Sequence, residues 1–220
     1  MNGNSHDALT AARLAMVETQ MRRRGITDQR VLAAMSKVPR HEFLSRQYWP
    51  DAYADHPVPI GEQQTTSQPY IIAVMLQAAE IKPQDRVLEI GAGSGYQTAL
   101  LCELAREVFA VERYPALAEE VSRRLEQFGY KNAIAVTGDG SLGLPQHAPY
   151  DAIVVAAAAP RIPPALVEQL ASAGRLVIPV GDAQQQVLQV ARKDADGNVS
   201  LTSLESCRFV PLVGQQGFAA

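Results

Sequence analysis

One stretch near the middle of the chain constrains its fold more than any other, because an apolar run there passes directly into alternating glycines. The run Arg86–Ile90 is followed by Gly91, Gly93 and Gly95, and a helical pattern begins near Tyr96. Glycine permits positive φ and lets a ligand approach the backbone where a Cβ would collide. A strand, a glycine loop and a helix in this order indicate an open α/β sheet that binds a ligand beyond the carboxyl ends of its strands.

The rest of the second half of the chain repeats this alternation of strand and helix. Short aliphatic runs without polar alternation occur at residues 86–90, 108–111, 134–136, 151–155 and 175–180. The clearest helix between them covers residues 115–128, with one apolar stripe and Gly129 at its end. Such runs predict a parallel sheet covered by helices on both faces, and right-handed crossovers make it doubly wound.

The two ends of the chain depart from this pattern. Runs at 187–192 and 199–210 flank the turn-rich residues 194–198, which predicts antiparallel strands at one edge of the sheet. We therefore expect a mostly parallel, Rossmann-like sheet of seven strands. Before it, apolar spacing predicts helices over 6–24 and 27–37, separated by Gly25.

Residues 48–69 contain five prolines and glycines among polar residues, which predicts a long ordered loop without regular elements. Together with the helices before it, this loop forms an N-terminal helical and loop extension. We expect one domain over residues 1–220, in which the extension spans 1–68 and the Rossmann-like core spans 69–220.

Composition narrows the class of protein. The chain has 220 residues, 47% of them hydrophobic, and a net charge of −3, which favours a globular domain and excludes extended disorder. The basic run Arg22, Arg23 and Arg24 is typical of a solvated helix face and is too short for a nucleic-acid footprint. No apolar run approaches the roughly 20 residues that span a bilayer. We expect a cytoplasmic protein without a nucleic-acid or membrane partner.

Cysteine and histidine spacing adds two further expectations. Cys102 and Cys207 allow at most one disulfide, which favours a reducing compartment, and Cys102 falls in a helix where a core position is expected. The four histidines show neither H-E-x-x-H nor a partner cysteine at a zinc-like spacing. No metal site is predicted.

The ligand of the glycine loop is narrowed by its spacing. The loop has G-x-G-x-G, whereas dinucleotide-binding proteins favour G-x-G-x-x-G. Glu112 ends the next strand, where a carboxylate can accept hydrogen bonds from two ribose hydroxyls. Gly138-Asp139-Gly140 follows the third strand on the same sheet edge, where it could meet an adenine amino group. Each feature also has a simpler interpretation as a tight turn, a strand-end carboxylate or a turn residue.

These residues resemble the class I S-adenosyl-L-methionine-dependent methyltransferases. A more specific resemblance, to the protein-L-isoaspartate O-methyltransferases, extends from about Met16 to Val213. It is carried by six runs: VPR at 38–40, PIG at 59–61, QTTSQPY at 64–70, LEIGAGSGY at 88–96, GRLVIPVG at 174–181 and FVPL at 209–212. The glycine loop identifies only the class, whereas QTTSQP is specific to the family.

The resemblance implies an enzyme that transfers methyl from S-adenosyl-L-methionine, with S-adenosyl-L-homocysteine as product. The acceptor is the free α-carboxyl of L-isoaspartyl residues in damaged proteins and peptides, so the reaction is one of protein repair. We expect a monomer. The implied cofactor-binding residues are Gln64, Thr65, Thr66, Glu89, Gly91, Ala92, Gly93, Ser94, Gly95, Glu112, Arg113, Asp139 and Gly140.

The chemistry of this acceptor needs little from the protein. A carboxyl with an ordinary pKa of about 3.5 to 4 is already ionised at neutral pH, so no general base is required. The resemblance assigns the active-site serine to Ser67, as a hydroxyl donor that orients the acceptor carboxylate. The sequence shows no basic side chain in a motif with Ser67 that could remove its proton, so Ser67 is not expected to act as a covalent nucleophile. On the residues alone, a serine ahead of Pro69 is also typical of a helix N-cap.

The sequence departs from the family at one loop. The family run is close to G-H-G-Q-T-I-S, whereas residues 61–67 read GEQQTTS, so a glycine is lost, Glu62 is gained and Thr66 replaces an apolar residue. Glu62 would repel an anionic acceptor unless it points to solvent. These changes motivate an alternative in which the acceptor is another carboxylate or a small molecule. A non-catalytic cofactor-binding module and a nicotinamide oxidoreductase are further alternatives, and the spacing G-x-G-x-G disfavours the latter.

Overall fold

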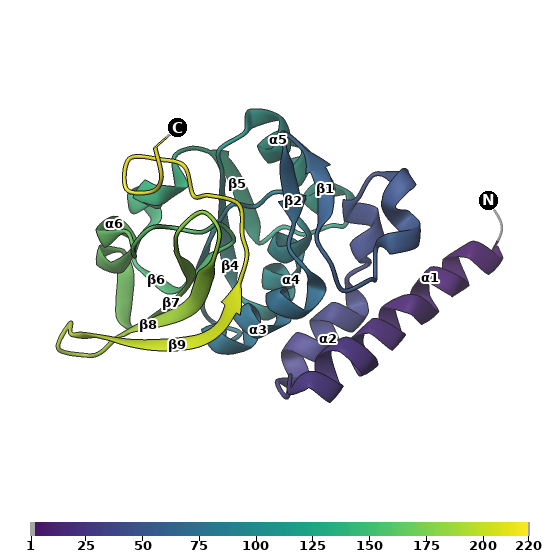
Figure 1. Ribbon diagram of the computed structural model, residues 1–220, viewed down its shortest axis with the longest axis horizontal. Helices are drawn as coiled ribbons and strands as arrows, with labels where there is room; N and C mark the ends of the chain where they lie inside the picture. The colour runs from purple at the N-terminus through teal and green to yellow at the C-terminus, as the bar shows by residue number, and fades with distance from the viewer. Residues whose placement is uncertain (1–2, 220) are drawn as a thin grey trace.

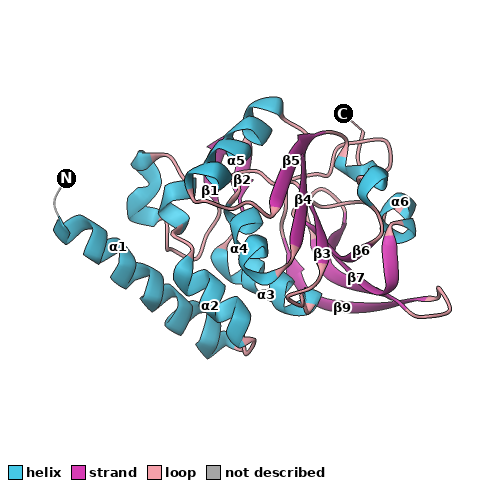
Figure 2. Cartoon of the chain, turned by 180° about the vertical axis from the view of Figure 1, so that it is seen from behind, coloured by secondary structure: helices cyan, strands magenta, loops and turns pink. Residues whose placement is uncertain are grey.

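Seven strands form one twisted sheet in the order β5-β4-β3-β6-β7-β8-β9 (Figures 1 and 2). The computed structural model describes residues 3–219. Strands β3 to β7 pair in parallel, whereas β8 and β9 are antiparallel to their neighbours, so the predicted mostly parallel sheet with an antiparallel edge is confirmed. The strands are β3 (Arg86–Ile90), β4 (Glu107–Glu112), β5 (Ala133–Thr137), β6 (Tyr150–Val155), β7 (Leu170–Gly181), β8 (Gln186–Lys193) and β9 (Val199–Cys207).

The strand order reverses beside β3. The chain moves outward from β3 through β4 to β5 and then returns to place β6 on the other side of β3. Connections on the two sides therefore lead away from each other and leave a crevice at the carboxyl ends of β3 and β6. Gly91 and Ala156 are the residues that follow these two strands.

Helices cover both faces of the sheet, as expected for a doubly wound fold (Figure 2). One buried cluster joins α3, α4 and α5 to side chains such as Val87 and Val108, and a second joins α6 to the opposite face through Leu166 and Leu176. The helices are α3 (Pro69–Ala79), α4 (Tyr96–Leu104), α5 (Pro115–Gln127) and α6 (Pro164–Glu168). Short 3₁₀ helices occupy Arg22–Arg24, Arg40–Phe43, Arg46–Asp51, Gly140–Leu142 and Pro145–His147.

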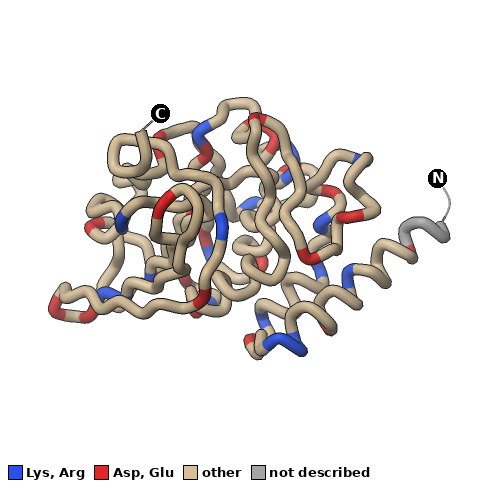
Figure 3. The backbone as a smooth tube through the Cα atoms, viewed as in Figure 1, with Lys and Arg blue, Asp and Glu red and all other residues tan. Residues whose placement is uncertain are grey.

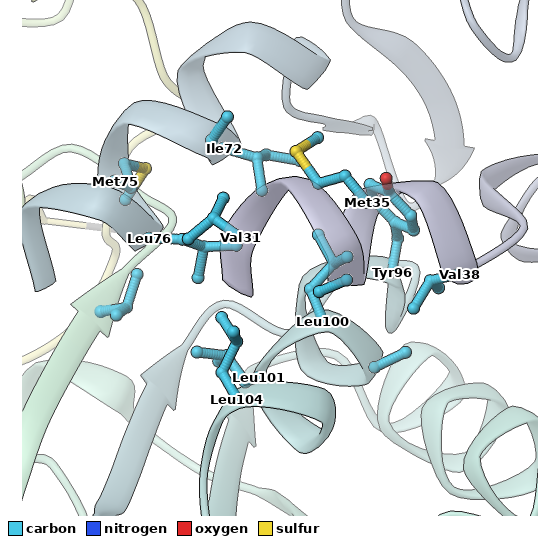
Figure 4. Packing of buried hydrophobic residues seen from close by; sticks show 14 of the residues in the cluster. Val31, Met35, Val38, Ile72, Met75, Leu76, Tyr96, Leu100, Leu101 and Leu104 are labelled. Atoms are coloured by element: carbon cyan, nitrogen blue, oxygen red, sulfur yellow. The ribbon is translucent and has the colours of Figure 1, made fainter. Parts of the chain in front are cut away.

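The N-terminal extension packs onto the core through its second helix. Helix α1 (Gly3–Met16) continues as a π-helical turn over Val17–Met21, and α2 (Gln29–Lys37) follows. Asp28 caps α2 by accepting hydrogen bonds from the backbone N–H groups of Arg30 and Val31. Figure 4 shows Val31 and Met35 of α2 between side chains of α3 and α4. This contact fixes the extension against α3 and α4, and α4 begins directly after the glycine loop.

The proline-rich segment contains regular structure, so the prediction of a loop without elements over 48–69 was wrong. Strands β1 (Val58–Gly61) and β2 (Gln64–Thr66) form an antiparallel hairpin. Pro59 is tolerated because the hairpin is a two-stranded sheet of edge strands, in which a residue without an N–H can face outward. The turn consists of Glu62 and Gln63, both with positive φ (49° and 58°).

Charged residues of both signs are interspersed along the backbone (Figure 3). The basic run is paired with carboxylates: Arg22 and Arg23 lie within 4 Å of Glu18, and Arg24 forms an ion pair with Asp55. None of the described helices is both long enough and apolar enough to cross a membrane.

Candidate active site

Two cavities meet at the carboxyl edge of the sheet and share one wall. The first, which we call the glycine-loop cavity, has a volume of about 110 Å³ and is lined by Gly91, Gly93 and Glu112 among others. The second, the serine cavity, has a volume of about 410 Å³ and is lined by Ser67 and the segment 205–210. Both cavities are lined by Thr65, Ala156 and Val210.

Glycine is required at two positions around the first cavity. Gly91 has φ 83°, and a Cβ there would lie 3.6 Å from the carbonyl carbon of Ala156. A Cβ on Gly140 would lie 2.4 Å from Cγ2 of Ile90, a buried side chain of β3, so no larger residue fits without displacement. Gly91 is therefore required by its backbone angle and Gly140 by the Ile90 side chain that already fills the place of a Cβ. Both residues line the cavity, so its wall there consists of backbone. This is a cradle suited to a flat, polar ligand such as a nucleoside.

Glu112 connects the glycine loop to the start of α5. Its Oε2 accepts a hydrogen bond from the Gly93 N–H at 2.8 Å, and its Oε1 accepts one from the Tyr114 N–H at 3.0 Å. The residue is 5% exposed and lines the glycine-loop cavity. Each carboxylate oxygen has a further lone pair, so the side chain can also accept from two vicinal hydroxyls. Gln64, Thr65 and Arg113, which the sequence predicts as cofactor-binding residues, line the same cavity.

Asp139 lies beside this cavity but faces the C-terminal segment. Its Oδ1 accepts from the backbone N–H of Ser141 at 2.9 Å and from the Ser141 hydroxyl at 2.6 Å, and its Oδ2 accepts from the Gln215 N–H at 2.8 Å. Partial burial opposes ionisation, but these hydrogen bonds outweigh it and lower the pKa of Asp139. The neighbouring Gly140, rather than the Asp139 carboxylate, lines the cavity.

Glu89 lies beneath the glycine loop and is fully buried. Its carboxylate accepts hydrogen bonds from Gln97 Nε2 at 3.0 Å and Thr98 Oγ1 at 2.5 Å, both on the first turn of α4. Burial raises the pKa of Glu89 to about 8, and these hydrogen bonds only partly oppose the shift.

Among the predicted cofactor-binding residues, those that line neither cavity are Thr66, Glu89, Ala92, Ser94, Gly95 and Asp139.

Ser67 lines the serine cavity with a hydroxyl that is available to a ligand. The N-cap of α3 is Gln68, and no side chain caps this helix, so the interpretation of Ser67 as a capping residue was wrong. Within the described chain Ser67 Oγ has no hydrogen-bond partner, and the residue is partly exposed.

Glu62 is exposed and lines neither cavity, which removes the expected repulsion of an anionic acceptor.

Several residues at the two cavities were missed in the sequence. Arg24 and Arg208 reach the site only through the fold, whereas Tyr114 directly follows the predicted residues Glu112 and Arg113. Arg208 is exposed, and no carboxylate of residues 3–219 forms an ion pair with it. Its position directly before the run 209–212 was the one signal that could have identified it.

Metal-binding groups are not gathered at this site. No three His, Cys, Asp or Glu side chains in the described part of the chain are arranged to hold a metal ion. Cys102 and Cys207 are both free thiols, and Cys102 is buried as expected.

The doubly wound sheet, the glycine cradle at its switch point and the Glu112 carboxylate define a Rossmann-like S-adenosyl-L-methionine-dependent methyltransferase. Comparison with known families makes this assignment more specific. The family model described as protein-L-isoaspartate(D-aspartate) O-methyltransferase matches residues 12–217, and the chain belongs to this family.

Relatives and solved structures agree with this assignment. The protein-L-isoaspartate O-methyltransferase of Koribacter versatilis is 56% identical to the chain, and the alignment covers 94% of the chain and 93% of the relative. The protein-L-isoaspartate O-methyltransferase of Protochlamydia amoebophila is 55% identical, and the alignment covers 92% of the chain and 97% of the relative. A solved protein-L-isoaspartate O-methyltransferase superposes with a TM-score of 0.83 at 28% identity, covering 93% of this chain and 67% of the other. A Plasmodium falciparum structure, described as a complex with S-adenosyl-L-homocysteine, superposes with a TM-score of 0.77 at 26% identity. The superposition covers 90% of this chain and 96% of the other.

The chain is therefore a methyltransferase of protein repair that uses S-adenosyl-L-methionine, as the sequence predicted. The lining of the glycine-loop cavity suits the chemistry of this cofactor, because exposed glycine backbone lies beside a carboxylate that can accept hydrogen bonds from ribose hydroxyls.

Proposed function

We propose that the cofactor binds in the glycine-loop cavity and that the isoaspartyl residue binds in the serine cavity, so that methyl transfer takes place where the two cavities adjoin. The observation that carries this proposal is that both cavities are lined by Thr65, Ala156 and Val210. Ser67 lies two residues beyond Thr65, on the acceptor side of the shared wall. When the two reactants are bound in adjoining cavities, the reacting groups are held close to each other, so no further bimolecular encounter is needed.

On the donor side, Glu112 holds the ribose hydroxyls, and the backbone of Gly91 and Gly93 approaches the rest of the cofactor. Arg113, which follows β4, and Gln64, which begins β2, line the same cavity and close it from the β4 side and the β2 side respectively. The bound cofactor supplies an electrophilic methyl group on a sulfonium. Glu89 does not line the cavity and acts through α4, because the hydrogen bonds that it accepts from Gln97 and Thr98 fix the helix that begins at the glycine loop.

On the acceptor side, the Ser67 hydroxyl donates a hydrogen bond to one oxygen of the isoaspartyl α-carboxylate and leaves the other oxygen to face the methyl group. Arg208 lines the same cavity with an unpaired positive charge and attracts this anion. None of the described residues that line the serine cavity is a lysine or a histidine. The chemistry requires none, because the carboxylate is ionised at neutral pH.

Three broader properties belong to the same proposal. The chain acts as a monomer of one domain over residues 1–220, with the core at 69–220 and the extension at 1–68 packed on it through α2. It works in the cytoplasm, where the free thiols of Cys102 and Cys207 remain reduced. It needs no nucleic acid, since its basic run is paired with Glu18 and Asp55.

A matched peptide pair tests the proposal. The protein is incubated with labelled S-adenosyl-L-methionine and two peptides that differ only in an isoaspartyl or an aspartyl linkage, and base-labile label is counted. We expect label in the isoaspartyl peptide alone. Equal labelling of both would indicate a different carboxylate acceptor, and cofactor binding without any labelling would indicate a non-catalytic module.

A further inference from the structure

The serine cavity continues into a second hollow that no part of the mechanism above uses. This hollow, which we call the α3–β9 groove, has a volume of about 420 Å³. Arg24, Tyr70 and Glu205 line both the groove and the serine cavity, so the two adjoin at these residues. From these residues the groove runs between α3 and the outer strands of the sheet, where Figure 1 shows β9 as the edge strand with α3 nearby.

The junction between the cavity and the groove is rigidly built. The Arg24 guanidinium lies 3.4 Å from the centroid of the Tyr70 ring and forms an ion pair with Asp55. The Tyr70 hydroxyl donates to Glu205 Oε1 at 3.4 Å, which links α3 to β9. Asp55 also accepts from the Tyr70 N–H at 3.3 Å and from Gln68 Nε2 at 2.7 Å. These contacts hold the opening next to Ser67 in place.

Beyond the junction the groove is mainly apolar. Val74 and Ala78 of α3 form one wall, and Val190 of β8 lies on its floor together with Thr202 and Leu204 of β9. Leu204 is 43% exposed although it is a large apolar side chain. The far end is closed by the ion pair of Glu80 and Arg192, whose nearest atoms are 2.7 Å apart. An exposed apolar floor between polar ends is a surface suited to an extended polypeptide.

We propose that the α3–β9 groove binds the polypeptide that flanks the isoaspartyl residue, as an extended chain that places an apolar side chain against Leu204 and Val74. This inference rests on the proposed function, because it takes the serine cavity as the place of the acceptor. An isoaspartyl residue in a protein continues into chain on both sides, so at least one flank must leave the cavity. The side toward Thr65, Ala156 and Val210 faces the cofactor, whereas the side bordered by Arg24, Tyr70 and Glu205 adjoins the groove.

The geometry also sets the spacing of the apolar residue. Strand β9 lines the serine cavity from Glu205 onward and the groove from Thr202 to Glu205. An extended chain that lies along β9 advances at the same rise of about 3.3 Å per residue. If the isoaspartyl residue lies beside residues 206–208, which line the serine cavity, the residue that reaches Leu204 lies about two to four positions from it.

Two charge substitutions on β9 form a matched pair for the test. Leu204→Asp places a carboxylate on the floor of the groove. Leu201→Asp makes the same change at a more exposed apolar side chain, 60% exposed, on the same strand. Leu201 pairs with Ala191, which belongs to the buried cluster on the α6 face, whereas Thr202 pairs with Val190 on the α3 face. Leu201 therefore points away from the groove.

Kinetics with isoaspartyl peptides of two lengths measure the effect. The short peptide carries one residue on each side of the isoaspartyl residue, and the long peptides carry six, with leucine or glycine at positions two to four on one side. We expect Leu204→Asp to raise the ratio of KM for the long leucine peptide to KM for the short peptide about tenfold, the factor that corresponds to ~1.4 kcal/mol. The glycine peptides and Leu201→Asp should leave this ratio unchanged.

Each other result has one meaning. If Leu204→Asp leaves the ratio unchanged, or if Leu201→Asp changes it equally, the groove does not bind the flank. If sedimentation shows that Leu204 instead joins two copies of the chain while the peptide kinetics do not move, the groove proposal is also overturned. If the wild-type protein labels no isoaspartyl peptide of either length, the proposed function fails, which is distinguishable from failure of the groove alone.

Discussion

At the scale of single residues, the unpartnered hydroxyl of Ser67 has the most direct consequence. Replacing Ser67 with alanine removes one hydrogen bond to a charged acceptor, and such bonds contribute about 1.5 to 3 kcal/mol. We expect Ser67→Ala to lower kcat by roughly 10- to 100-fold while the affinity for S-adenosyl-L-homocysteine, measured by calorimetry, stays constant. Ser203→Ala on the exposed part of β9 is the control. A parallel loss of turnover and cofactor affinity would show that Ser67 instead holds its loop together.

The buried carboxyl of Glu89 predicts how stability depends on pH. Its pKa is raised from 4.5 to about 8, so between these values the folded state holds a proton that the unfolded state has lost. Stability contributed by this group therefore falls as pH rises from about 4.5 to 8, by at most about 1.4 kcal/mol per pH unit. Glu89→Gln removes the titration and should flatten urea-unfolding free energies across this range. Glu126→Gln, on the exposed side of α5, should leave the slope as it is, and an unchanged slope in Glu89→Gln would contradict the assignment.

At the scale of elements, Arg175 joins the end of α3 to the sheet. Its guanidinium is buried and donates to the carbonyls of Ala79, Glu80 and Asp151 and to Asp85 Oδ2, at 2.6 to 2.9 Å. These carbonyls include two at the C-terminus of the helix, which have no partner within it.

We expect Arg175→Leu to lower the free energy of unfolding by about 3 to 5 kcal/mol, because it leaves Asp85 buried without its partner. Arg192→Leu is the matched control, since Arg192 pairs with the side chain of the same Glu80 at an exposed position, where such pairs contribute about 0 to 1 kcal/mol. Chemical denaturation of both variants measures the difference. Equal losses would mean that burial does not set the strength of these contacts.

The elements also show what could be predicted from the sequence. The parallel strands and the glycine loop were found because each is encoded locally, by an apolar run or by closely spaced residues such as Gly91 and Gly93, whereas β8 and β9 were found from the turn-rich residues 194–198 between them. The β1–β2 hairpin was missed because Pro59 suggests a break, whereas an edge strand accepts it. Its turn gave no signal either, since Glu62 and Gln63 adopt the positive φ that glycine or asparagine usually supplies.

The site was predicted in part for the same reason. Residues of the glycine loop and Glu112 follow predicted strands directly, so their place at the sheet edge could be inferred. Arg24 and Arg208 line the same serine cavity although they lie far apart in sequence, and no local pattern shows that two such distant residues share a cavity. The simpler role of Ser67 as a helix cap could be discarded only once α3 was seen to begin after Gln68.

At the scale of the whole molecule, the common wall of Thr65, Ala156 and Val210 makes the binding of the two substrates interdependent. A cationic analogue of the cofactor should bind more tightly in the presence of an isoaspartyl peptide, and the peptide must gain by the same factor, about 5- to 30-fold. Calorimetric titrations in both orders measure this, with the aspartyl peptide as control. Identical affinities with and without the isoaspartyl peptide would show that the cavities act separately.

The same wall has a consequence for how the reaction cycle ends. Esterification removes the negative charge on one side of the partition, and loss of the methyl group removes the positive charge on the other. The electrostatic attraction that drew the two molecules together therefore disappears in the act of turnover. We expect this loss of attraction to favour the release of both products, the methyl ester and S-adenosyl-L-homocysteine.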